Sequence, residues 1–320
     1  MGSFNTFDVM RNVIGIEIGS TRIKHALIDE QGKDLYYAEI PSHGKVSAEA
    51  VISQIKLAVN NILDFARSKD ISITGIGVGS PGIVDSVKGE IVGKAENLAG
   101  WKNIPLVQIL RTEFDCPVYI DNDANVMALA EFSFGAGQGY SDIVYLTIGT
   151  GIGGGLILNK QPYTGFRNRG SELGHTPLVF QGRSCNCGSK GCLERYASLS
   201  ALVTDYKELL RSQNLPIPEK LDAKLIAELY KENQKEAIEA LDRHCDYLGY
   251  GIAGFVNTFS PQRVIIGGAL SEYAEFYAEK IDKNVRKYAM NDSMVNTEIV
   301  TGQLGPLVGC LGAANLVFTA

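Results

Sequence analysis

The sequence carries one histidine and three cysteines close together in a glycine-rich segment between Glu172 and Glu194. The four residues are His175, Cys185, Cys187 and Cys192. One imidazole and three thiolates form a complete Cys3His set for tetrahedral Zn²⁺. Because all four ligands would be protein atoms, we predict a closed site in which the metal builds structure and activates no water. We call residues 172–194 the zinc knot, and its two glutamates are the side chains that it would position.

Two other interpretations of these cysteines remain open, namely free thiols and disulfides. The chain begins MGSFNTFDVM, without a basic and then an apolar region, so we expect no secretory signal and no disulfides. The other three cysteines, Cys116, Cys245 and Cys310, occur singly in apolar surroundings, which is typical of small buried side chains. Zinc is therefore the favoured interpretation.

The composition limits the class of protein. The chain has 320 residues, of which 45% are hydrophobic and 21% charged, with a net charge of -6. This length allows two domains with proper cores. An acidic balance argues against a nucleic-acid partner, and no apolar run is long enough to cross a bilayer. We therefore expect a soluble cytoplasmic protein that binds neither nucleic acid nor membrane.

The apolar pattern predicts an α/β protein in which a strand, a glycine turn and a second strand occur twice. The first unit of this kind comprises residues 13–18, 19–21 and 23–28, and the second comprises residues 143–148, 149–151 and 154–158. The spacing indicates a weak internal duplication. Further strands are predicted at 34–40, 73–78, 117–120 and 263–266, and helices at 48–67, 124–134, 198–211, 223–231, 234–259 and 272–288.

Both glycine turns have the composition of an anion-binding loop. Gly19-Ser20-Thr21 and Gly149-Thr150-Gly151 would expose successive backbone N–H groups as well as hydroxyls. Each turn alone is equally consistent with an ordinary hairpin and with an anion-binding loop. The presence of two such turns favours a nucleotide-binding site. Gly149-x-Gly151-x-x-Gly154 matches the dinucleotide fingerprint, yet a strand follows it where that motif requires a helix, so we reject that interpretation.

Two acidic residues, Asp123 and Glu17, are candidates for a role in phosphoryl transfer from such a nucleotide. Asp123 follows a predicted buried strand and precedes a helix, a suitable place for a base that accepts the proton of an attacking alcohol. Its alternative is a helix N-cap, which is compatible with that role. Glu17 lies inside an apolar strand, either as an outer-sphere ligand of nucleotide-bound Mg²⁺, which we favour, or in an ion pair with Lys24 or Arg22.

Taken together, these motifs resemble the ROK family of sugar kinases, in the actin-like ATPase superfamily. The segments that carry the resemblance, beyond the two glycine turns and the zinc knot, are Gly79-Ser80-Pro81-Gly82, Asn97-Leu98-Ala99-Gly100-Trp101, Asn122-Asp123-Ala124-Asn125 and Ile266-Gly267-Gly268. The resemblance implies two actin-like (ribonuclease H-like) α/β domains flanking a cleft, with a structural zinc knot. We expect the domains at residues 1–122 and 123–320, with the C-terminal helix packing back on the first domain.

The resemblance also implies a function in carbohydrate metabolism, the ATP-dependent phosphorylation of a hexose, most of all glucose at its 6-hydroxyl. Asp123 would be the catalytic base, with ATP, Mg²⁺ and structural Zn²⁺ as cofactors and a homodimer as the assembly. The sugar-binding residues would be Gly82, Asn97, Asn122, Asp123, Glu172, His175 and Glu194. The ATP-binding residues would be Glu17, Gly19, Ser20, Thr21, Thr150, Gly151, Gly267 and Gly268.

The first glycine turn departs from the family pattern, which reads Asp-x-Gly-Gly-Thr-Lys. Here Glu17 lengthens the acidic arm by one methylene, and Ser20 adds a side chain where the backbone approaches phosphate. The alternatives to a glucose kinase are a kinase for another hexose or an N-acetylhexosamine, and a non-catalytic sugar sensor. About a dozen residues precede Val13, so we expect no DNA-binding module in the chain.

Overall fold

The computed structural model describes residues 10–93, 95 and 97–320, which divide into two compact units. Unit 1 runs to Ala130 and also includes Pro306–Ala320, and unit 2 is Glu131–Gly305. The boundary falls inside the helix α3 (Asp123–Phe134), whereas the sequence predicts it before this helix. Val126, in the first turn of α3, lies against Gly79 of β4 and Gly312 of α10, so the chain leaves unit 1 only in the middle of the helix.

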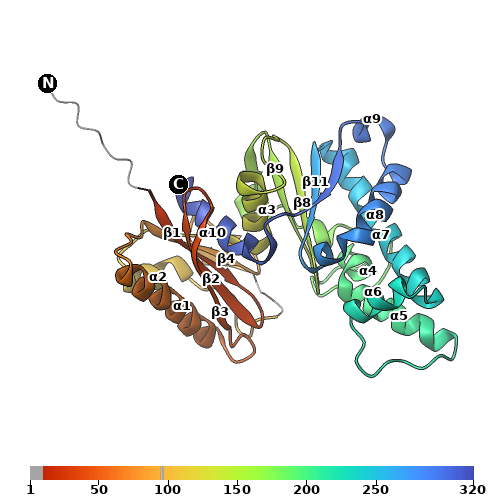
Figure 1. Ribbon diagram of the computed structural model, residues 1–320, viewed down its shortest axis with the longest axis horizontal. Helices are drawn as coiled ribbons and strands as arrows, with labels where there is room; N and C mark the ends of the chain where they lie inside the picture. The colour runs from red at the N-terminus through yellow and green to blue at the C-terminus, as the bar shows by residue number, and fades with distance from the viewer. Residues whose placement is uncertain (1–9, 94, 96) are drawn as a thin grey trace. The chain divides into compact units, whose positions relative to one another are not determined.

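Unit 1 contains a five-stranded sheet in the order β3-β2-β1-β4-β7 (Figure 1). Its first three strands are antiparallel, and β4 and β7 continue the sheet parallel to β1. The strands are β1 (Asn12–Ile18), β2 (Arg22–Asp29), β3 (Asp34–Pro41), β4 (Gly75–Ser80) and β7 (Val118–Asn122), beside a short hairpin of β5 (Val84–Asp85) and β6 (Glu90–Ile91).

One face of this sheet packs against α1 (Ala48–Ser68), the predicted amphipathic helix. Ser47 caps α1 by accepting the N–H of Ala50, and buried residues such as Ile55 and Ile62 recur along one face of the helix. They meet the buried isoleucines of β1 in a single apolar core. The short helix α2 (Leu106–Glu113), which the sequence pattern does not predict, also joins this core.

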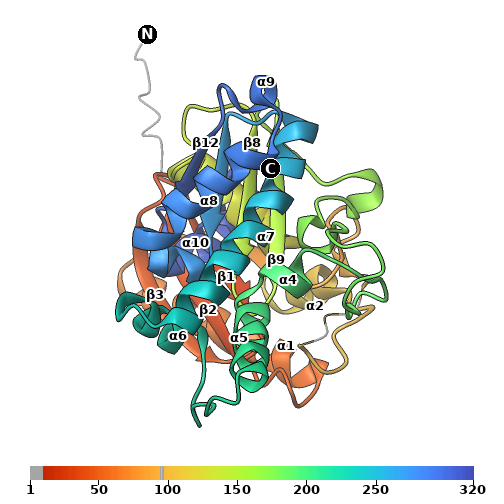
Figure 2. The ribbon, with the colours of Figure 1, turned by 90° about the vertical axis from the view of Figure 1, so that its right-hand side faces the viewer.

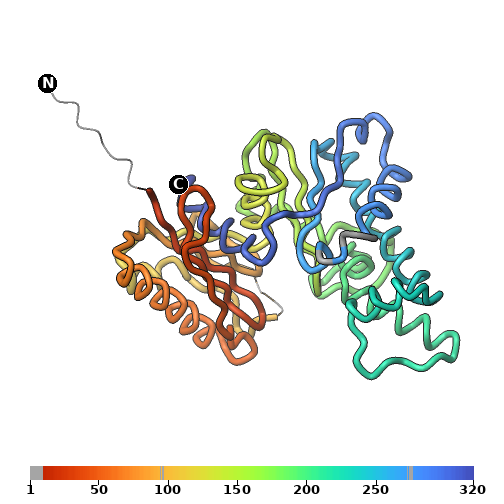
Figure 3. Tube along the Cα trace, in the orientation of Figure 1, coloured from red at the N-terminus to blue at the C-terminus, as the bar shows by residue number. Residues whose placement is uncertain are grey.

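The opposite face of the sheet packs against α10 (Val308–Phe318), and the trace in Figure 3 shows this blue C-terminal helix returning to the red N-terminal strands. A Cβ atom at Gly15 would clash with the carbonyl of Cys310, and one at Gly77 with the carbonyl of Ala313. Both glycines therefore allow the helix backbone to approach the strands closely. Because α10 is buried on nearly all sides, its sequence is apolar without a polar face.

Unit 2 repeats the same sheet topology, with the order β10-β9-β8-β11-β12. Again the first three strands form an antiparallel meander and the last two are parallel to β8. The strands are β8 (Ile143–Ile148), β9 (Ile152–Leu158), β10 (Gln161–Tyr163), β11 (Arg263–Gly267) and β12 (Glu298–Thr301). The duplication that the two glycine turns indicate is thus present in the strand order.

Helices supply most of the rest of unit 2. The longest, α7 (Lys235–Phe259), runs beside α8 (Ala274–Tyr288), as Figures 1 and 2 both show. The others are α4 (Glu194–Ala197), α5 (Leu199–Ser212), α6 (Ala223–Lys231) and α9 (Asn291–Met294). Short 3-10 turns lie at η1 (Phe166–Asn168), η2 (Leu173–His175) and η3 (Ala269–Tyr273) in this unit, and at η4 (Gly305–Leu307), where the chain passes into unit 1. Among the described residues, no helix is both long and apolar enough for a bilayer.

Candidate functional site

The predicted sugar and phosphate residues of unit 1 share one edge of its sheet. Strand pairing places Glu17 of β1 opposite Gly79 of β4, and Gly79 opposite Asp121 of β7. Since these three strands are parallel, the segments that follow their carboxyl ends emerge at the same edge. This is the edge at which open α/β sheets bind ligands.

The backbone at the start of α3 holds Asp123 in a defined place. The side chain of Asn122 caps the helix, because its Oδ1 accepts the N–H groups of Ala124 at 2.9 Å and Asn125 at 3.3 Å. Asp123 is therefore the first helical residue and not the cap, and its Oδ1 accepts the N–H of Ala124 at 2.9 Å. The carboxyl group is half-buried at a helix N-terminus, where the helix dipole favours a negative charge.

The same cap connects to the glycine-proline loop after β4. Asn122 donates from Nδ2 to the carbonyl of Gly82 at 3.1 Å, and Gly82 adopts a positive φ of 90° that favours glycine. Behind this loop, the buried Trp101 ring donates to Oγ of Ser80 at 3.0 Å. The asparagine at position 97 is exposed at the start of the segment that ends in Trp101. The structure thus brings Gly82 together with Asn122 and links both to the Asn-Leu-x-Gly-Trp segment.

The first glycine turn is as tight as the sequence predicts. Gly19 donates its N–H to the carbonyl of Arg22 at 2.8 Å, and a Cβ at Gly19 would lie 2.7 Å from that carbonyl oxygen. Ser42 braces the turn by donating from Oγ to the carbonyl of Ser20 at 2.8 Å. The side chains of Ser20 and Thr21 are exposed, so their hydroxyls are accessible to a ligand.

Glu17 forms the ion pair that the sequence offers as its alternative role. Lys24 Nζ lies 3.2 Å from Oε1 and 3.3 Å from Oε2 of Glu17. Burial raises the pKa of Glu17, Lys24 lowers it, and the net direction is upward. Arg22, the other partner that we considered, pairs with Glu39 instead.

Asp121 is a residue of this edge that the sequence prediction misses. It is buried at the end of β7, and its Oδ1 accepts the N–H of Asn122 at 2.6 Å and Nδ2 of Asn125 at 3.2 Å. Burial raises its pKa, and these two hydrogen bonds counteract the rise. An acidic residue inside an otherwise apolar strand, directly before Asn122, is the signal that could have identified it.

In unit 2, the predicted ATP-binding residues gather at the carboxyl ends of β8 and β11. Thr147 of β8 pairs with Gly267 of β11, so the turn 149–151 and Gly268 follow neighbouring strand ends. Gly268 has a φ of 76°, and a Cβ there would lie 2.7 Å from both backbone N and O of Ile148. Gly268 therefore lies beside Ile148, the residue that leads into the turn 149–151.

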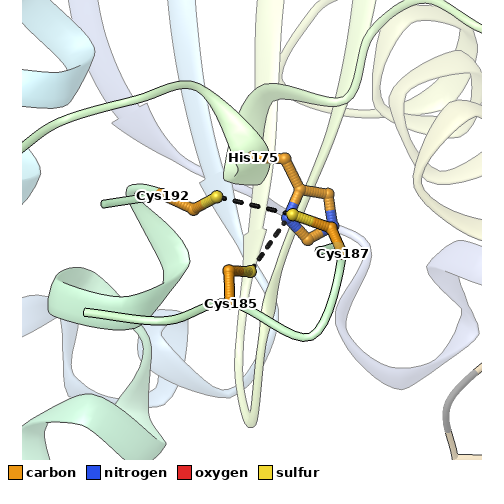
Figure 4. Close-up of side chains that lie close together, drawn as sticks. All are labelled: His175, Cys185, Cys187 and Cys192. Carbon is orange, nitrogen blue, oxygen red and sulfur yellow. Dashed lines mark hydrogen bonds between the residues drawn. The ribbon is translucent and has the colours of Figure 1, made fainter. Parts of the chain in front are cut away.

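The four predicted zinc ligands come together in the zinc knot, as Figure 4 shows. Their donor atoms all lie within 4.8 Å of one another. Nδ1 of His175 lies 3.6 Å from Sγ of Cys185, and Sγ of Cys187 lies 3.6 Å from Sγ of Cys192. A tetrahedral zinc ion with bonds of about 2.3 Å requires sulfur atoms about 3.8 Å apart, so the cluster fits Zn²⁺. The described cysteines form no disulfide, and of the other three Cys245 and Cys310 are buried and Cys116 is half-buried.

Local backbone geometry explains why this segment folds into a compact loop. Cys185 donates its N–H to the carbonyl of Ser189 at 2.9 Å, with Gly188 at a φ of 92° in the turn between them. Gly191, at a φ of 76°, has no room for a Cβ beside the carbonyl of Val179. The turn η2 packs on β9, because a Cβ at Gly174 would clash with the carbonyl of Ile152.

The zinc knot positions two glutamates and one ring nitrogen. Desolvation raises the pKa of Glu172 although its side chain is exposed; His175 lowers it and Glu194 raises it further. Since Nδ1 of His175 faces the thiols, Nε2 lies on the other side of the ring. Glu194 accepts the N–H of Ile152 on Oε2 at 2.9 Å, a bond that the sequence does not predict. Of the predicted sugar residues of unit 2, Glu194 thus lies next to the predicted phosphate turn 149–151.

The candidate residues therefore form two groups, one within each unit. Unit 1 carries Glu17, Gly19, Ser20, Thr21, Gly82, Asn97, Asn122 and Asp123, and unit 2 carries Thr150, Gly151, Glu172, His175, Glu194, Gly267 and Gly268. In each group, most members lie at the carboxyl ends of parallel strands or in loops bonded to them.

Comparison with known proteins agrees with this arrangement. A glucokinase of Thermotoga maritima is 34% identical over 312 residues, 95% of this chain and 96% of that protein. A xylose repressor of Caldicellulosiruptor bescii is 30% identical over 96% of this chain and 78% of the repressor.

The crystal structure of a ROK family glucokinase from Streptomyces griseus, in complex with glucose and AMPPNP, is similar with a TM-score of 0.84 and 29% sequence identity. The match covers 97% of this chain and 100% of that one. The predicted two-domain actin-like α/β fold is confirmed. The sequence pattern of the ROK family matches residues 13–320, and the chain belongs to the ROK family.

Proposed function

We propose that the protein is an ATP-dependent sugar kinase that transfers the γ-phosphoryl group to the 6-hydroxyl of a hexose, with glucose as the first candidate. Family membership and the similarity to glucokinases along the whole chain support this proposal. The observation that carries it is the position of Asp123, half-buried at the N-terminus of α3, beside the Asn122 and Gly82 pair.

Asp123 acts as the general base of this reaction. Its carboxylate accepts the proton of the sugar hydroxyl while the hydroxyl oxygen forms a bond to the γ-phosphorus and the bond to the β-phosphate oxygen breaks. The products are a sugar phosphate and ADP. The side-chain cap by Asn122 fixes the helix start, so the carboxylate does not have to be ordered during the reaction.

Each unit has polar candidate groups for sugar recognition. In unit 1 these are the backbone of Gly82 and the side chains of Asn97 and Asn122, and in unit 2 they are Glu172, His175 and Glu194. Carboxylates and amides suit adjacent sugar hydroxyls because each can accept or donate two hydrogen bonds.

The candidate phosphate-binding elements are the glycine turn of each unit and, in unit 2, the Gly267-Gly268 segment. The backbone N–H groups and hydroxyls of 19–21 and 149–151 donate to phosphate oxygens. Glu17, whose two oxygens both lie against Lys24, would be an outer-sphere ligand of the Mg²⁺ that the nucleotide carries. A Zn²⁺ ion held by the four residues of the zinc knot would supply rigidity and no chemistry, because four protein ligands leave no open position.

The test is an assay of ADP release with Mg-ATP over a panel of glucose, mannose, fructose, allose and N-acetylated hexosamines. We expect ADP release that depends on sugar and is highest with one hexose. ATP hydrolysis that no sugar stimulates would contradict the proposal. Sedimentation in the same buffer tests the homodimer that we also propose, and fractionation of the native cells tests a cytoplasmic location.

A sugar-responsive repressor is the second candidate, because a xylose repressor matches 96% of this chain. A gel shift separates the two candidates. Specific DNA binding that sugar releases, without any sugar-dependent ADP formation, would favour the repressor.

A further inference from the structure

Glu194 connects the zinc knot to the turn 149–151 through one of its two carboxylate oxygens. It is the first residue of α4, two positions after the zinc ligand Cys192. Its Oε2 accepts the N–H of Ile152 at 2.9 Å, and Ile152 is the residue that leaves the turn and begins β9. The other oxygen, Oε1, accepts no hydrogen bond from the part of the chain that the structure describes.

Gly151, the last residue of the turn, lies against the same carboxylate oxygen of Glu194. A Cβ atom at Gly151 would clash with Oε2 of Glu194, and it would lie 3.3 Å from the carboxyl carbon. The turn is closed by the N–H of Gly149, which donates to the carbonyl of Gly151 at 2.9 Å. Leu199, at the start of α5, donates its N–H to the carbonyl of Gly149, also at 2.9 Å. The helices that follow the zinc knot therefore brace this turn from one side.

We propose that Glu194 is a positioning residue for the nucleotide, in addition to its sugar contact, and that it sets the conformation of the turn 149–151. This inference rests on the proposed function, since it takes that turn as the site of the ATP phosphates. A carboxylate would repel phosphate, so it acts here on the backbone: it takes up the N–H of Ile152 and occupies the space beside Gly151.

The arrangement predicts coupling between sugar and nucleotide. A sugar hydroxyl bound to Oε1 restrains the same carboxylate that fixes the turn through Oε2, so sugar raises the affinity for nucleotide. By thermodynamic linkage, nucleotide raises the affinity for sugar by the same factor. If Glu194 bound only the sugar, its replacement would leave the affinity for nucleotide in the absence of sugar unchanged.

The experiment measures the Kd of ADP and of AMPPNP by calorimetry in the absence of sugar, with the zinc-loaded full chain. Glu194→Ala removes the acceptor of a charge-assisted hydrogen bond, and we expect Kd to rise about tenfold. Glu194→Gln retains a carbonyl oxygen that can accept from Ile152, so we expect a rise of less than about threefold. An unchanged sugar-free Kd in Glu194→Ala would overturn the proposal.

A second variant tests the contact from the other side. Gly151→Ala places a methyl group where Oε2 of Glu194 lies, so it should weaken nucleotide binding by itself. In combination with Glu194→Ala the two losses should not add, because the methyl group then occupies the vacated space. Additive losses would contradict the proposal. Gly254→Ala in α7 is the control, because a Cβ there meets nothing within 4 Å.

Two further readouts separate positioning from folding. Zinc content and Tm should match the wild type in Glu194→Gln, while hydrogen exchange at the Ile152 amide should be faster. If sugar-dependent ADP release is absent but nucleotide Kd follows Glu194, the kinase proposal fails and this inference stands. If sugar-dependent ADP release is present but the nucleotide Kd is the same in Glu194→Ala as in the wild type, the kinase proposal stands and this inference fails. A chain that binds no nucleotide contradicts both proposals.

Discussion

Lys24 lies within 3.3 Å of both carboxylate oxygens of Glu17, on the neighbouring strand of the same sheet. Only 12% of the Glu17 side chain is exposed, and α10 covers it with Gly309, whose missing side chain leaves the space for the carboxylate. Burial disfavours the ionised form of Glu17, and Lys24 partly offsets this cost. The negative charge of Glu17, at the end of β1, is therefore stabilised by Lys24.

Lys24→Met should lower the free energy of unfolding by about 1–2 kcal/mol at pH 7, since it leaves a largely buried carboxylate without its partner. Adding Glu17→Gln should recover most of this loss. Urea denaturation of the two single variants and the double variant measures the coupling. Because the pKa of Glu17 is raised, the loss in Lys24→Met should shrink as pH falls and the carboxyl group is protonated. Additive single losses would contradict this interpretation of the pair.

The zinc knot should contain one zinc ion per chain by metal analysis. Cys192→Ser should reduce the zinc content and lower Tm, because the fully buried Cys192 sulfur is one of four ligands. Cys116→Ser is the matched control, since Cys116 is half-buried in unit 1 and should leave the zinc content unchanged. Full zinc content in Cys192→Ser would show that the cluster is not the metal site.

Glu131 should be a large contributor to the stability of unit 2. Its buried carboxylate accepts the N–H groups of Ala136 at 2.8 Å, Gln303 at 2.9 Å and Leu304 at 3.1 Å. Glu131→Ala leaves three amides without their acceptor, so we expect a loss of about 3 kcal/mol or more in urea denaturation. Hydrogen exchange at Gln303 and Leu304 should also become faster.

The control for Glu131 is Glu239→Ala, an exposed glutamate that pairs with Arg243. An exposed pair of this kind contributes about 0.5 kcal/mol. Equal losses in the two variants would contradict the role of Glu131.

His244 should make the protein less stable in acid. Burial lowers its pKa to about 4, from 6.5, and Nε2 lies 3.3 Å from the carbonyl of Ser198. Between these two values the unfolded chain carries a proton that the folded chain lacks, so the free energy of unfolding falls as pH drops from 6.5 to 4. The total effect is about 3 kcal/mol.

Leucine cannot be protonated. In His244→Leu the free energy of unfolding should therefore change less steeply with pH between 4 and 6.5, and the difference in slope should correspond to about one proton. Urea denaturation at half-unit steps measures the slope. His43→Asn, at an exposed position with a φ of 53°, is the control that should keep the wild-type slope. The same slope in His244→Leu would show that His244 is not the responsible group.

The sequence predicts the sheets because their longer strands either alternate apolar and polar residues or are continuously apolar, and because glycine turns separate them. The pattern misses β12 and β10, which have 4 and 3 residues and too few side chains for a period. It also starts β9 at Gly154, whereas the strand begins at Ile152. Three successive glycines have low strand propensity, but Leu173 of η2 packs against β9 and leaves no room for a Cβ at Gly154.

The candidate site is predictable where residue type alone decides the chemistry. Three cysteines and a histidine with this spacing predict the cluster that the structure contains. The contacts of Glu131 and Glu194 are not predictable in this way, because each joins segments whose proximity depends on the finished fold. Glu194 and Ile152 are 42 positions apart, and Glu131 and Gln303 are 172 apart.

The most direct test of the central claim compares the wild type with Asp123→Asn in the presence of Mg-ATP and the best sugar of the panel. Asparagine cannot take the hydroxyl proton, so we expect kcat to fall by about 10³-fold or more, with the Kd of the sugar changed by less than about threefold. Asp64→Asn, in which only the exposed pair with Arg67 is lost, should keep the wild-type kcat. Wild-type turnover in Asp123→Asn would contradict the assignment of Asp123 as the base.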